Sequence, residues 1–282
     1  MTTPRRRPAP VFHPVTVADI SQLTPRMRRI TFSGEKLADY PNDGPATHFK
    51  LLLPAPGQAE ITLPEPGPDG PVWPEPRPLR RTYTPRYVDR AGQRLVVDFF
   101  LHGDGGPASA WAAAARVGDR LIVTGARGSY RIDPDTGWTL LVADETSLPA
   151  VGTILDEAPE GARVLLVAEV ADTAEQLVFD PAAELTTVWC HRDEGDAGFG
   201  MLAAQAVQDL ALPDAPLSGG PLPGGPLSDG QGAAWIGLEA TAMRTVRRHL
   251  LGERGLDREQ LYTRGYWKLG VSDHPDHDTG ED

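Results

Sequence analysis

Hydrophobic and polar positions divide the chain into two parts with different patterns. In the first part, short runs rich in β-branched and aromatic residues are separated by clusters of proline, glycine and aspartate. These runs cover residues 11–17, 27–33, 48–53, 79–87, 95–101 and 120–124, and residues 107–115 have the composition of a helix. Six strands at this spacing with one helix predict a small closed antiparallel barrel.

From Trp138 onward, apolar runs typical of strands alternate with helical segments. The expected strands cover residues 139–143, 163–170, 185–191 and 233–238, and the expected helices cover residues 148–157, 199–210 and 240–251. Such alternation is typical of a parallel sheet covered by helices. We therefore predict a two-domain β + α/β fold, in which a six-stranded antiparallel barrel (residues 11–134) precedes a parallel α/β domain (residues 135–270).

Three segments are expected to contribute little to either core. Residues 1–10 contain three arginines without an apolar stretch behind them, and we expect a flexible N-terminus. Residues 212–232 form a near-repeat of proline, glycine, serine and leucine, which predicts a flexible insertion. Residues 271–282 form an acidic tail without lysine or arginine, which we expect to be disordered and solvated.

Composition limits the chemistry of the chain. The formal net charge of −12 argues against a nucleic-acid binder that works by phosphate neutralisation. A single cysteine, Cys190, excludes an internal disulfide, a thiolate iron–sulfur cluster and a multi-cysteine zinc site, and we expect no metal site. No apolar run is long enough to span a bilayer. We therefore expect a cytoplasmic monomer without stable membrane association, in which redox chemistry would need a bound organic cofactor.

Four consecutive residues offer the groups that a flavin nucleotide needs. Alternation along a strand places Arg81 and Tyr83 on one face, with Thr82 and Thr84 on the other. An arginine suits a phosphate as a bidentate fork, and an aromatic face suits a flat ring. Arg80 competes with Arg81 for the phosphate role.

A second segment, about twenty residues later, is suited to a pyrophosphate. His102 follows an apolar strand, and a Gly-rich turn then leads into a helix that begins with small residues. These residues let backbone N–H groups approach an anion at the positive end of the helix dipole. The expected cofactor contacts in this segment are His102, Gly106, Pro107, Ala108 and Ser109. A purely structural role for His102 remains open.

Four motifs in a fixed order resemble the siderophore-interacting proteins, which are flavin-dependent ferric-siderophore reductases related to ferredoxin–NADP reductases. The motifs are RTYTPRYVD, VDFFLHGDGGPASAWAAAARVGDRLIVTGARG, VADETSLPAV and RGYWKLG, and the resemblance extends over residues 11–270. It implies FAD on the barrel and NAD(P)H on the α/β domain, with the choice between NADH and NADPH open. It also implies hydride transfer to the flavin, followed by reduction of Fe(III) in a siderophore to Fe(II) for iron release in the cell.

The resemblance further implies roles for single residues. Tyr83 is expected to stack on the isoalloxazine ring, Arg81 to neutralise the pyrophosphate and Thr84 to lie near the reactive flavin nitrogen. The segment Asp144, Glu145 and Thr146 is expected to touch flavin and nicotinamide. The expected catalytic residues are Thr84, Asp144 and Glu239. The expected cofactor contacts outside the second segment are Arg81, Thr82, Tyr83, Thr84, Asp144, Glu145, Thr146 and Trp267.

Several further expectations concern substrates. Lys50, Arg264 and Lys268 are predicted to form a basic patch for an anionic ferric chelate. Leu238 stands where the family has glycine, and it is expected to narrow the approach to the nucleotide.

Two residues give conflicting indications of the nucleotide: Glu169 would bond a ribose hydroxyl, whereas Arg192 would attract a 2′-phosphate. Alternative functions are an NAD(P)H–flavin reductase, a ferredoxin or flavodoxin reductase, and a non-catalytic flavin-containing siderophore-binding protein.

Overall fold

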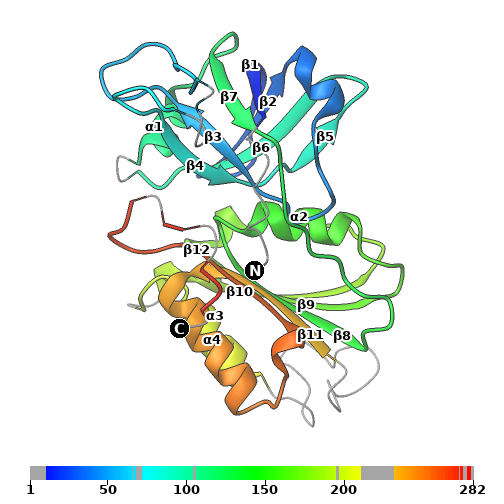
Figure 1. Cartoon of the computed structure of the whole chain (residues 1–282). Coiled ribbons are helices and arrows are strands. Elements are labelled where there is room, and N and C mark those ends of the chain that lie inside the picture. Colours follow the sequence, from blue (N-terminus) through cyan, green and yellow to red (C-terminus); the bar gives the residue numbers. More distant parts are fainter. Residues whose placement is uncertain are drawn as a thin grey trace, which may run out of the picture.

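The structure is a computed structural model that describes residues 11–65, 67, 72–103, 106–194, 197–210, 232–272, 274–275 and 278–280. The expected flexible N-terminus and residues 212–231 of the expected insertion lie outside the described residues, as does part of the acidic tail. Figure 1 shows two domains, one above the other, with the first half of the chain in the upper domain.

The upper domain is a single antiparallel sheet of seven strands. The strands are β1 (Phe12–Gln22), β2 (Met27–Ser33), β3 (Phe49–Leu53), β4 (Leu79–Tyr83), β5 (Tyr87–Asp89), β6 (Arg94–Phe100) and β7 (Arg120–Thr124). They lie in the order β4-β3-β7-β1-β2-β6-β5 and curl into a half-barrel (Figure 1). The predicted fold class is confirmed, and helix α1 (Pro107–Ala114) lies where a helix was expected.

The barrel has seven strands where the sequence predicted six. The expected strand over residues 79–87 is divided into β4 and β5, which lie at opposite ends of the sheet. Pro85 falls between them and has no N–H for a strand ladder, so the extended chain leaves the sheet there and joins it again beside β6.

Alternate residues of the strands fill the core of the half-barrel. Phe32 on β2 and Phe99 on β6 are fully buried, and their ring centroids lie 6.4 Å apart. Trp111 of α1 stacks on Phe32 at 6.2 Å and so closes one side of this core. Aromatic pairs at these distances stabilise a core beyond the area they bury. Trp111 is half-buried and packs against this core.

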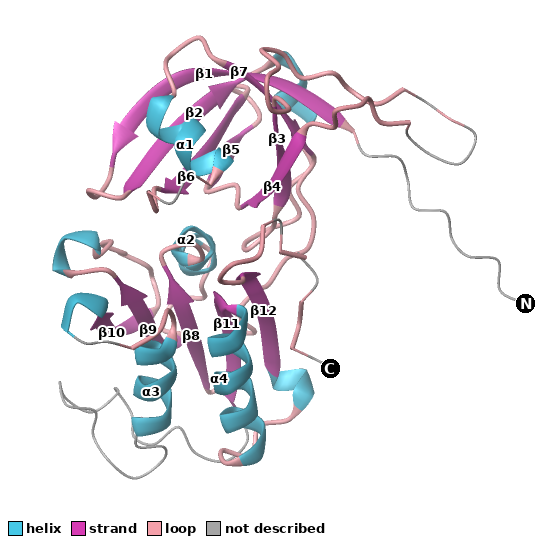
Figure 2. Ribbon diagram, turned by 90° about the vertical axis from the view of Figure 1, so that its left-hand side faces the viewer, coloured by secondary structure: helices cyan, strands magenta, loops and turns pink. Residues whose placement is uncertain are grey.

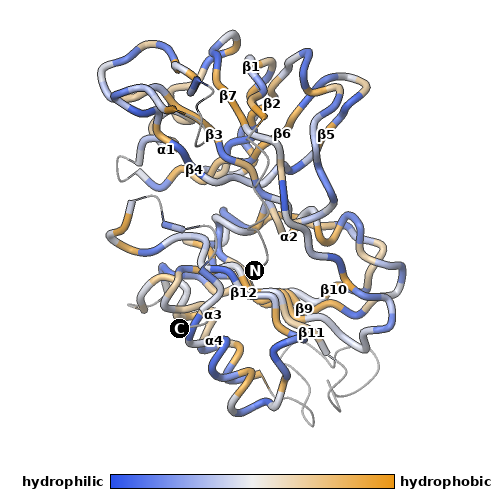
Figure 3. Tube along the Cα trace, viewed as in Figure 1, coloured by the Kyte–Doolittle hydropathy of each residue, from blue (hydrophilic) through white to orange (hydrophobic). Residues whose placement is uncertain are grey.

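The lower domain is a parallel sheet of five strands covered by helices. The strands are β8 (Trp138–Asp144), β9 (Arg163–Val170), β10 (Glu184–His191), β11 (Gly232–Glu239) and β12 (Leu261–Trp267), in the order β10-β9-β8-β11-β12. Helix α2 (Leu148–Asp156) covers one face, and α3 (Met201–Asp209) and α4 (Ala240–Gly252) cover the other (Figure 2). Figure 3 shows long hydrophobic stretches in these strands, as expected for a sheet buried on both faces. Short 3₁₀ turns occur at Glu35–Asp39, Thr173–Glu175, Arg192–Glu194 and Arg258–Gln260.

The strand β12 was not predicted as a strand. It pairs with β11 at the edge of the sheet and carries the terminal motif to the carboxyl ends of the strands. From β8 to β10 the strands are added on one side of β8, and β11 and β12 are added on its other side, so the strand order reverses between β8 and β11. In open α/β sheets, ligands bind outside the carboxyl ends of the strands at such a reversal. The ends of β8, β11 and β12 therefore mark the place for a ligand in this domain.

The described tail residues 274–275 and 278–280 lie against β12 and α4, whereas the composition predicted a solvated tail. The carbonyl of Asp278 accepts a hydrogen bond from the Gly265 backbone N–H at 2.9 Å, and its carboxylate accepts one from Arg244 at 2.8 Å. A Cβ on Gly265 would lie 3.0 Å from side-chain atoms of Asp278 and His274. Glycine at this position therefore permits the close approach, which the charge pattern alone did not indicate.

Candidate functional site

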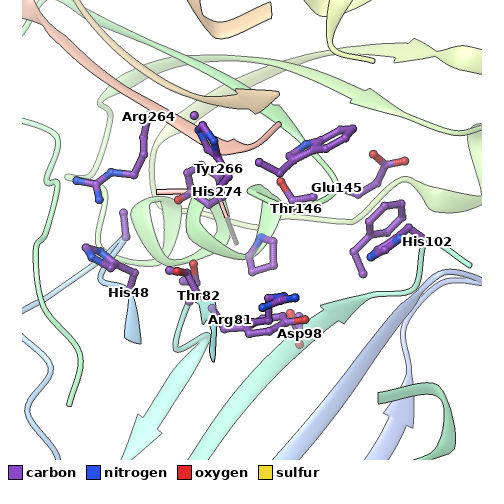
Figure 4. Close-up of a pocket in the computed structure, with 17 residues that line it drawn as sticks. His48, Arg81, Thr82, Asp98, His102, Glu145, Thr146, Arg264, Tyr266 and His274 are labelled. Carbon is purple, nitrogen blue, oxygen red and sulfur yellow. The ribbon is translucent and has the colours of Figure 1, made fainter. Parts of the chain in front are cut away.

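Two adjoining pockets form a cleft between the half-barrel and the carboxyl edge of the parallel sheet. Figure 4 shows the first of them, with side chains from both domains pointing into it. Residues that line both pockets come from β4, the end of β6, the start of α2, β12 and the C-terminal segment. They are Arg81, Thr82, Phe100, His102, Glu145, Thr146, Tyr266, Trp267 and His274.

Arg81 supplies a cation at the junction of the two pockets. Its guanidinium donates to the Ser272 hydroxyl at 3.0 Å and to the Arg80 carbonyl at 2.8 Å. Arg80 is exposed, and its guanidinium carbon lies 5.6 Å from the ring centroid of Trp73. Arg80 lines neither pocket, so the structure places Arg81 and not its competitor in the cleft.

The other three residues of the RTYT motif also line the first pocket. The Tyr83 ring packs on Phe99 with centroids 4.5 Å apart, and burial raises its pKa. Thr82 accepts a hydrogen bond from the Lys50 ammonium at 2.6 Å. Thr84 is buried, and the Tyr266 ring of β12 lines the same pocket, where burial raises the pKa of its hydroxyl. The barrel motif and β12 therefore face each other across this pocket.

The segment from His102 to α1 reaches the second pocket through only some of its expected residues. His102, Gly106 and Pro107 line it. A Cβ on Gly106 would lie 2.6 Å from Cε1 of His102, so glycine allows the imidazole to pack against the start of the helix. Ala108 is buried in the barrel core, and the Ser109 hydroxyl accepts from the His102 backbone N–H at 3.1 Å. The side chains of Ala108 and Ser109 therefore stabilise this turn. Only the backbone N–H groups of these two residues are available to bind a phosphate.

Asp144, the last residue of β8, forms a buried hydrogen-bond network. One carboxylate oxygen accepts from the Thr146 backbone N–H at 2.9 Å, and the other accepts from the indole N–H of Trp267 at 2.9 Å. Burial raises the pKa of Asp144 to about 6, with a smaller contribution from the neighbouring Glu145 carboxylate. The network fixes the position of the Trp267 ring relative to the end of β8.

The raised pKa of Asp144 predicts a pH-dependent stability. The folded protein binds a proton at this carboxyl more tightly than the unfolded chain does, so the contribution of Asp144 to stability is largest below about pH 4 and is lost as the pH rises through about 6. A shift of this size corresponds to about 3 kcal/mol in total, of which about 1 kcal/mol falls between pH 5 and pH 8. For Asp144→Asn, urea unfolding is expected to lose this part of the pH dependence. An unchanged slope relative to the wild type would contradict the assignment.

Glu145 and Glu169 share one counter-ion, Arg192. Glu145 bonds to the Arg192 guanidinium through both of its oxygens, one of them at 3.0 Å, and it also accepts from the Ala171 backbone N–H at 2.8 Å. Glu169 is fully buried and accepts from three backbone N–H groups at the start of α3, with Arg192 at 3.4 Å. Glu169 and Arg192, for which a ribose contact and a phosphate contact were expected, thus make internal bonds, and Arg192 also lines the second pocket.

Glu239, the last residue of β11, directly precedes α4 and lines neither pocket. Its carboxylate accepts from the Thr241 and Ala242 backbone N–H groups at 2.6 and 3.2 Å, and from the Leu269 N–H at 3.3 Å. The expected catalytic position is therefore a helix cap that also holds the start of the loop after β12. Leu238 is fully buried in the core beside α3 and α4, so it does not narrow the cleft as expected.

The structure brings two of the three expected substrate-binding cations to the cleft. Arg264 lines the first pocket and Lys268 the second, whereas Lys50 lines neither and donates to Thr82, which lines both. Two residues that the sequence did not indicate, His48 and His274, also line the first pocket, and Figure 4 shows His48 at the same end as Arg264. Neither histidine stands in a motif, so only their spatial convergence reveals them.

Other lining residues were also missed. Tyr266 belongs to the terminal motif, but the sequence did not predict this segment as a strand. Without a strand, the different contacts of the neighbouring Tyr266 and Trp267 side chains could not be inferred. Asp98 lines the first pocket and is held by Arg29 through two hydrogen bonds of 2.7 and 2.8 Å. Phe199 lines the second pocket and meets the Trp267 ring at 5.2 Å. These positions depend on contacts between segments far apart in the chain.

Within the described residues, no three histidine, cysteine, aspartate or glutamate side chains converge as potential metal ligands. Among the helices of the described part, none is both long and apolar enough to cross a membrane.

Comparison with known families matches both domains. Residues 16–130 match the siderophore-interacting FAD-binding domain, and residues 136–270 match the siderophore-interacting protein family. Together these matches cover the half-barrel and the parallel sheet that form the cleft.

Individual relatives agree with these matches. The crystal structure of a siderophore utilization protein from T. fusca superposes with a TM-score of 0.79 at 34% identity, covering 95% of this chain and 97% of that one. The ferric vibriobactin reductase ViuB of Vibrio cholerae is 27% identical over 89% of this chain and 87% of its own length. An NADPH-dependent ferric-chelate reductase of Escherichia coli is 34% identical over 65% of this chain and 72% of its own. The chain belongs to the siderophore-interacting protein family and carries its FAD-binding domain.

Proposed function

We propose that the protein is an FAD-dependent ferric-siderophore reductase that takes hydride from NADH or NADPH. The family membership and the names of two relatives, a ferric vibriobactin reductase and a ferric-chelate reductase, support an oxidoreductase that acts on ferric chelates. The observation that carries the proposal is the cleft itself, in which the RTYT motif of the half-barrel faces the carboxyl edge of the parallel sheet. A flavin and a nicotinamide need this juxtaposition to react.

The residues of the cleft fit FAD. The first pocket offers aromatic rings in Tyr83 and Tyr266 together with the ring of Pro149, which suits the flat isoalloxazine. Arg81 stands between the pockets, and the second pocket includes the start of α1, where unpaired helix N–H groups favour an anion. Bound FAD would accept a hydride and pass single electrons to Fe(III).

The remaining work of the site is positioning and electrostatics. Thr84 and Tyr266, which line the first pocket from the two domains, would contact the edge of the ring between them. Asp144 and Thr146 would keep the Trp267 indole in place at the nicotinamide side of the cleft. Glu239 would act indirectly, by holding the loop that carries Lys268. Iron needs no ligand from this protein, because hard oxygen ligands of the siderophore hold Fe(III) far better than Fe(II).

The cations at the open end of the cleft predict a charge preference for the ferric chelate. Lys268 is exposed beside the second pocket, and exposed charge pairs are worth at most about 1 kcal/mol. Lys268→Gln is therefore expected to raise KM for an anionic ferric chelate about two- to fivefold, with less effect at high salt. Arg248→Gln on α4, exposed and outside both pockets, is the control. Equal changes of KM in both variants would show that Lys268 does not contact the ferric chelate.

Ferrous iron formation tests the proposed function directly. The purified protein, NADH or NADPH and a ferric siderophore are combined with a ferrous trap, and the coloured complex is followed over time. Steady formation of the complex is expected, at a rate that depends on protein and nucleotide. Turnover of free flavin without chelate preference would indicate a general flavin reductase, and chelate binding without turnover would indicate a binding protein.

We also propose that the protein acts as a monomer in the cytoplasm, where reduction of the chelated iron releases it from the siderophore.

A further inference from the structure

The far end of the second pocket holds the elements of a phosphate site. Arg192, Phe199 and Gly200 line it together with Glu145, at the carboxyl ends of β8, β9 and β10. Gly200 is the residue before α3, whose first N–H groups have no partner within the helix. A helix N-terminus beside an arginine is a favourable place for a phosphate. A dinucleotide that lies along the carboxyl edge of this sheet would reach this end of the pocket.

Both elements are already engaged by internal carboxylates. Glu169 accepts from the N–H groups of Gly200, Leu202 and Ala203 at 2.7, 3.0 and 3.1 Å, so it occupies the position of an anion at the start of α3. Arg192 is bonded to Glu145 and Glu169, and its guanidinium carbon lies 5.1 Å from the ring centroid of Phe199. The side chains of Glu145 and Glu169 are 4% and 0% exposed, so water cannot replace their counter-ion.

We infer that this cluster of Glu145, Glu169 and Arg192 selects against a nucleotide with a phosphate on its adenosine ribose, so that NADH is preferred to NADPH. The inference rests on the proposed function. The three side chains carry a net charge of −1, whereas a phosphate monoester adds a charge between −1.5 and −2 at neutral pH. Arg192 could bind that phosphate only by leaving two buried carboxylates without a counter-ion, which is strongly unfavourable. The preference would distinguish this chain from the E. coli relative, which is named for NADPH.

Arg192 is in this account a positioning residue, which joins the ends of β8 and β9 to the start of α3. Arg192→Gln, which leaves both carboxylates without a counter-ion, is expected to weaken both nucleotides and, because the cluster becomes more negative, to lower kcat/KM for NADPH more than for NADH. An arginine that held the 2′-phosphate would instead affect NADPH alone, by about tenfold or more. Glu145→Gln, which makes the cluster neutral, is expected to shift the ratio towards NADPH. No shift, or a shift towards NADH, would contradict the role of this carboxylate.

Nucleotide binding and turnover together test the inference on the FAD-loaded protein. Calorimetry would compare adenosine 5′-monophosphate with adenosine 2′,5′-bisphosphate, which differ only in the 2′-phosphate, and flavin reduction would compare NADH with NADPH. We expect the bisphosphate to bind no more tightly than the monophosphate, and NADH to have a kcat/KM at least about tenfold higher. Tighter binding of the bisphosphate, or equal or faster reduction by NADPH, would overturn the inference. Failure of both nucleotides to reduce the flavin would refute the proposed function, and the two adenosine phosphates would still test the cluster.

Discussion

Glu169→Ala is expected to lower the free energy of unfolding by about 3–5 kcal/mol, the range seen when one partner of a buried ion pair is removed. The fully buried carboxylate accepts three backbone hydrogen bonds from the first residues of α3 and contacts Arg192 at 3.4 Å. Alanine would leave these donors unpaired in a buried site and would open a cavity between β9 and the helix. In thermal unfolding the loss corresponds to a decrease in Tm of about 10 °C.

A neighbouring glutamate provides the control. Glu184 begins β10, next to β9, and is exposed, so Glu184→Ala is expected to change stability by no more than about 0.5 kcal/mol. Urea unfolding followed by circular dichroism would measure both variants. If Glu169→Ala and Glu184→Ala were equally stable, Glu169 would not be the buried cap of α3, and the charge argument for nucleotide preference would lose its basis.

Arg81→Ala is expected to weaken FAD binding about 10- to 100-fold. Hydrogen bonds that involve a charged group contribute about 1.5–3 kcal/mol when they are well formed. Arg81 lines both pockets, and it is the charged residue of the RTYT motif, so it is expected to make such bonds to the cofactor. The protein with alanine should lose its yellow colour during purification or dialysis. Titration of the apoprotein with FAD, followed by flavin fluorescence, would give the change in Kd.

Two variants separate the cation from its surroundings. Arg80→Ala removes the adjacent arginine, which lies over Trp73 outside the cleft, and it should leave the affinity within about twofold. Ser272→Ala removes the hydroxyl that accepts from Arg81 at 3.0 Å but keeps the cation. If Ser272→Ala weakened FAD binding as much as Arg81→Ala, Arg81 would act by holding the C-terminal segment rather than by contacting the cofactor.

The elements of the fold follow from local patterns in the sequence. Alternating apolar runs gave most strands of the half-barrel within a few residues, and the change of pattern at Trp138 coincides with the first residue of β8. The division of residues 79–87 was missed because a run of suitable residues does not show which sheet edge each half will join. The strand β12 was missed because its sequence, LYTRGYW, is interrupted by a glycine and two polar residues. Its pairing with β11 depends on a long-range contact.

Sequence analysis identified the cleft residues that belong to contiguous motifs. It missed those that the fold brings together from distant parts of the chain. The RTYT motif, His102 and Asp144 all reach the cleft, as expected from their positions at strand ends. Glu239 was assigned to the cleft through the resemblance to the family pattern, but this residue caps α4, and the helix N–H groups bind its carboxylate. Sequence alone cannot decide between a ligand and a helix terminus as the partner of a buried carboxylate.

The most direct test of the proposed reductase is an anaerobic titration followed by visible absorbance. NADH or NADPH is added to the purified FAD-loaded protein, and a ferric siderophore is then added in the presence of a ferrous trap. The account predicts that the flavin absorbance bleaches with the nucleotide and returns with the siderophore, while the ferrous complex forms in proportion. Flavin that stays oxidised with both nucleotides, or reduced flavin that does not respond to the ferric siderophore, would contradict it.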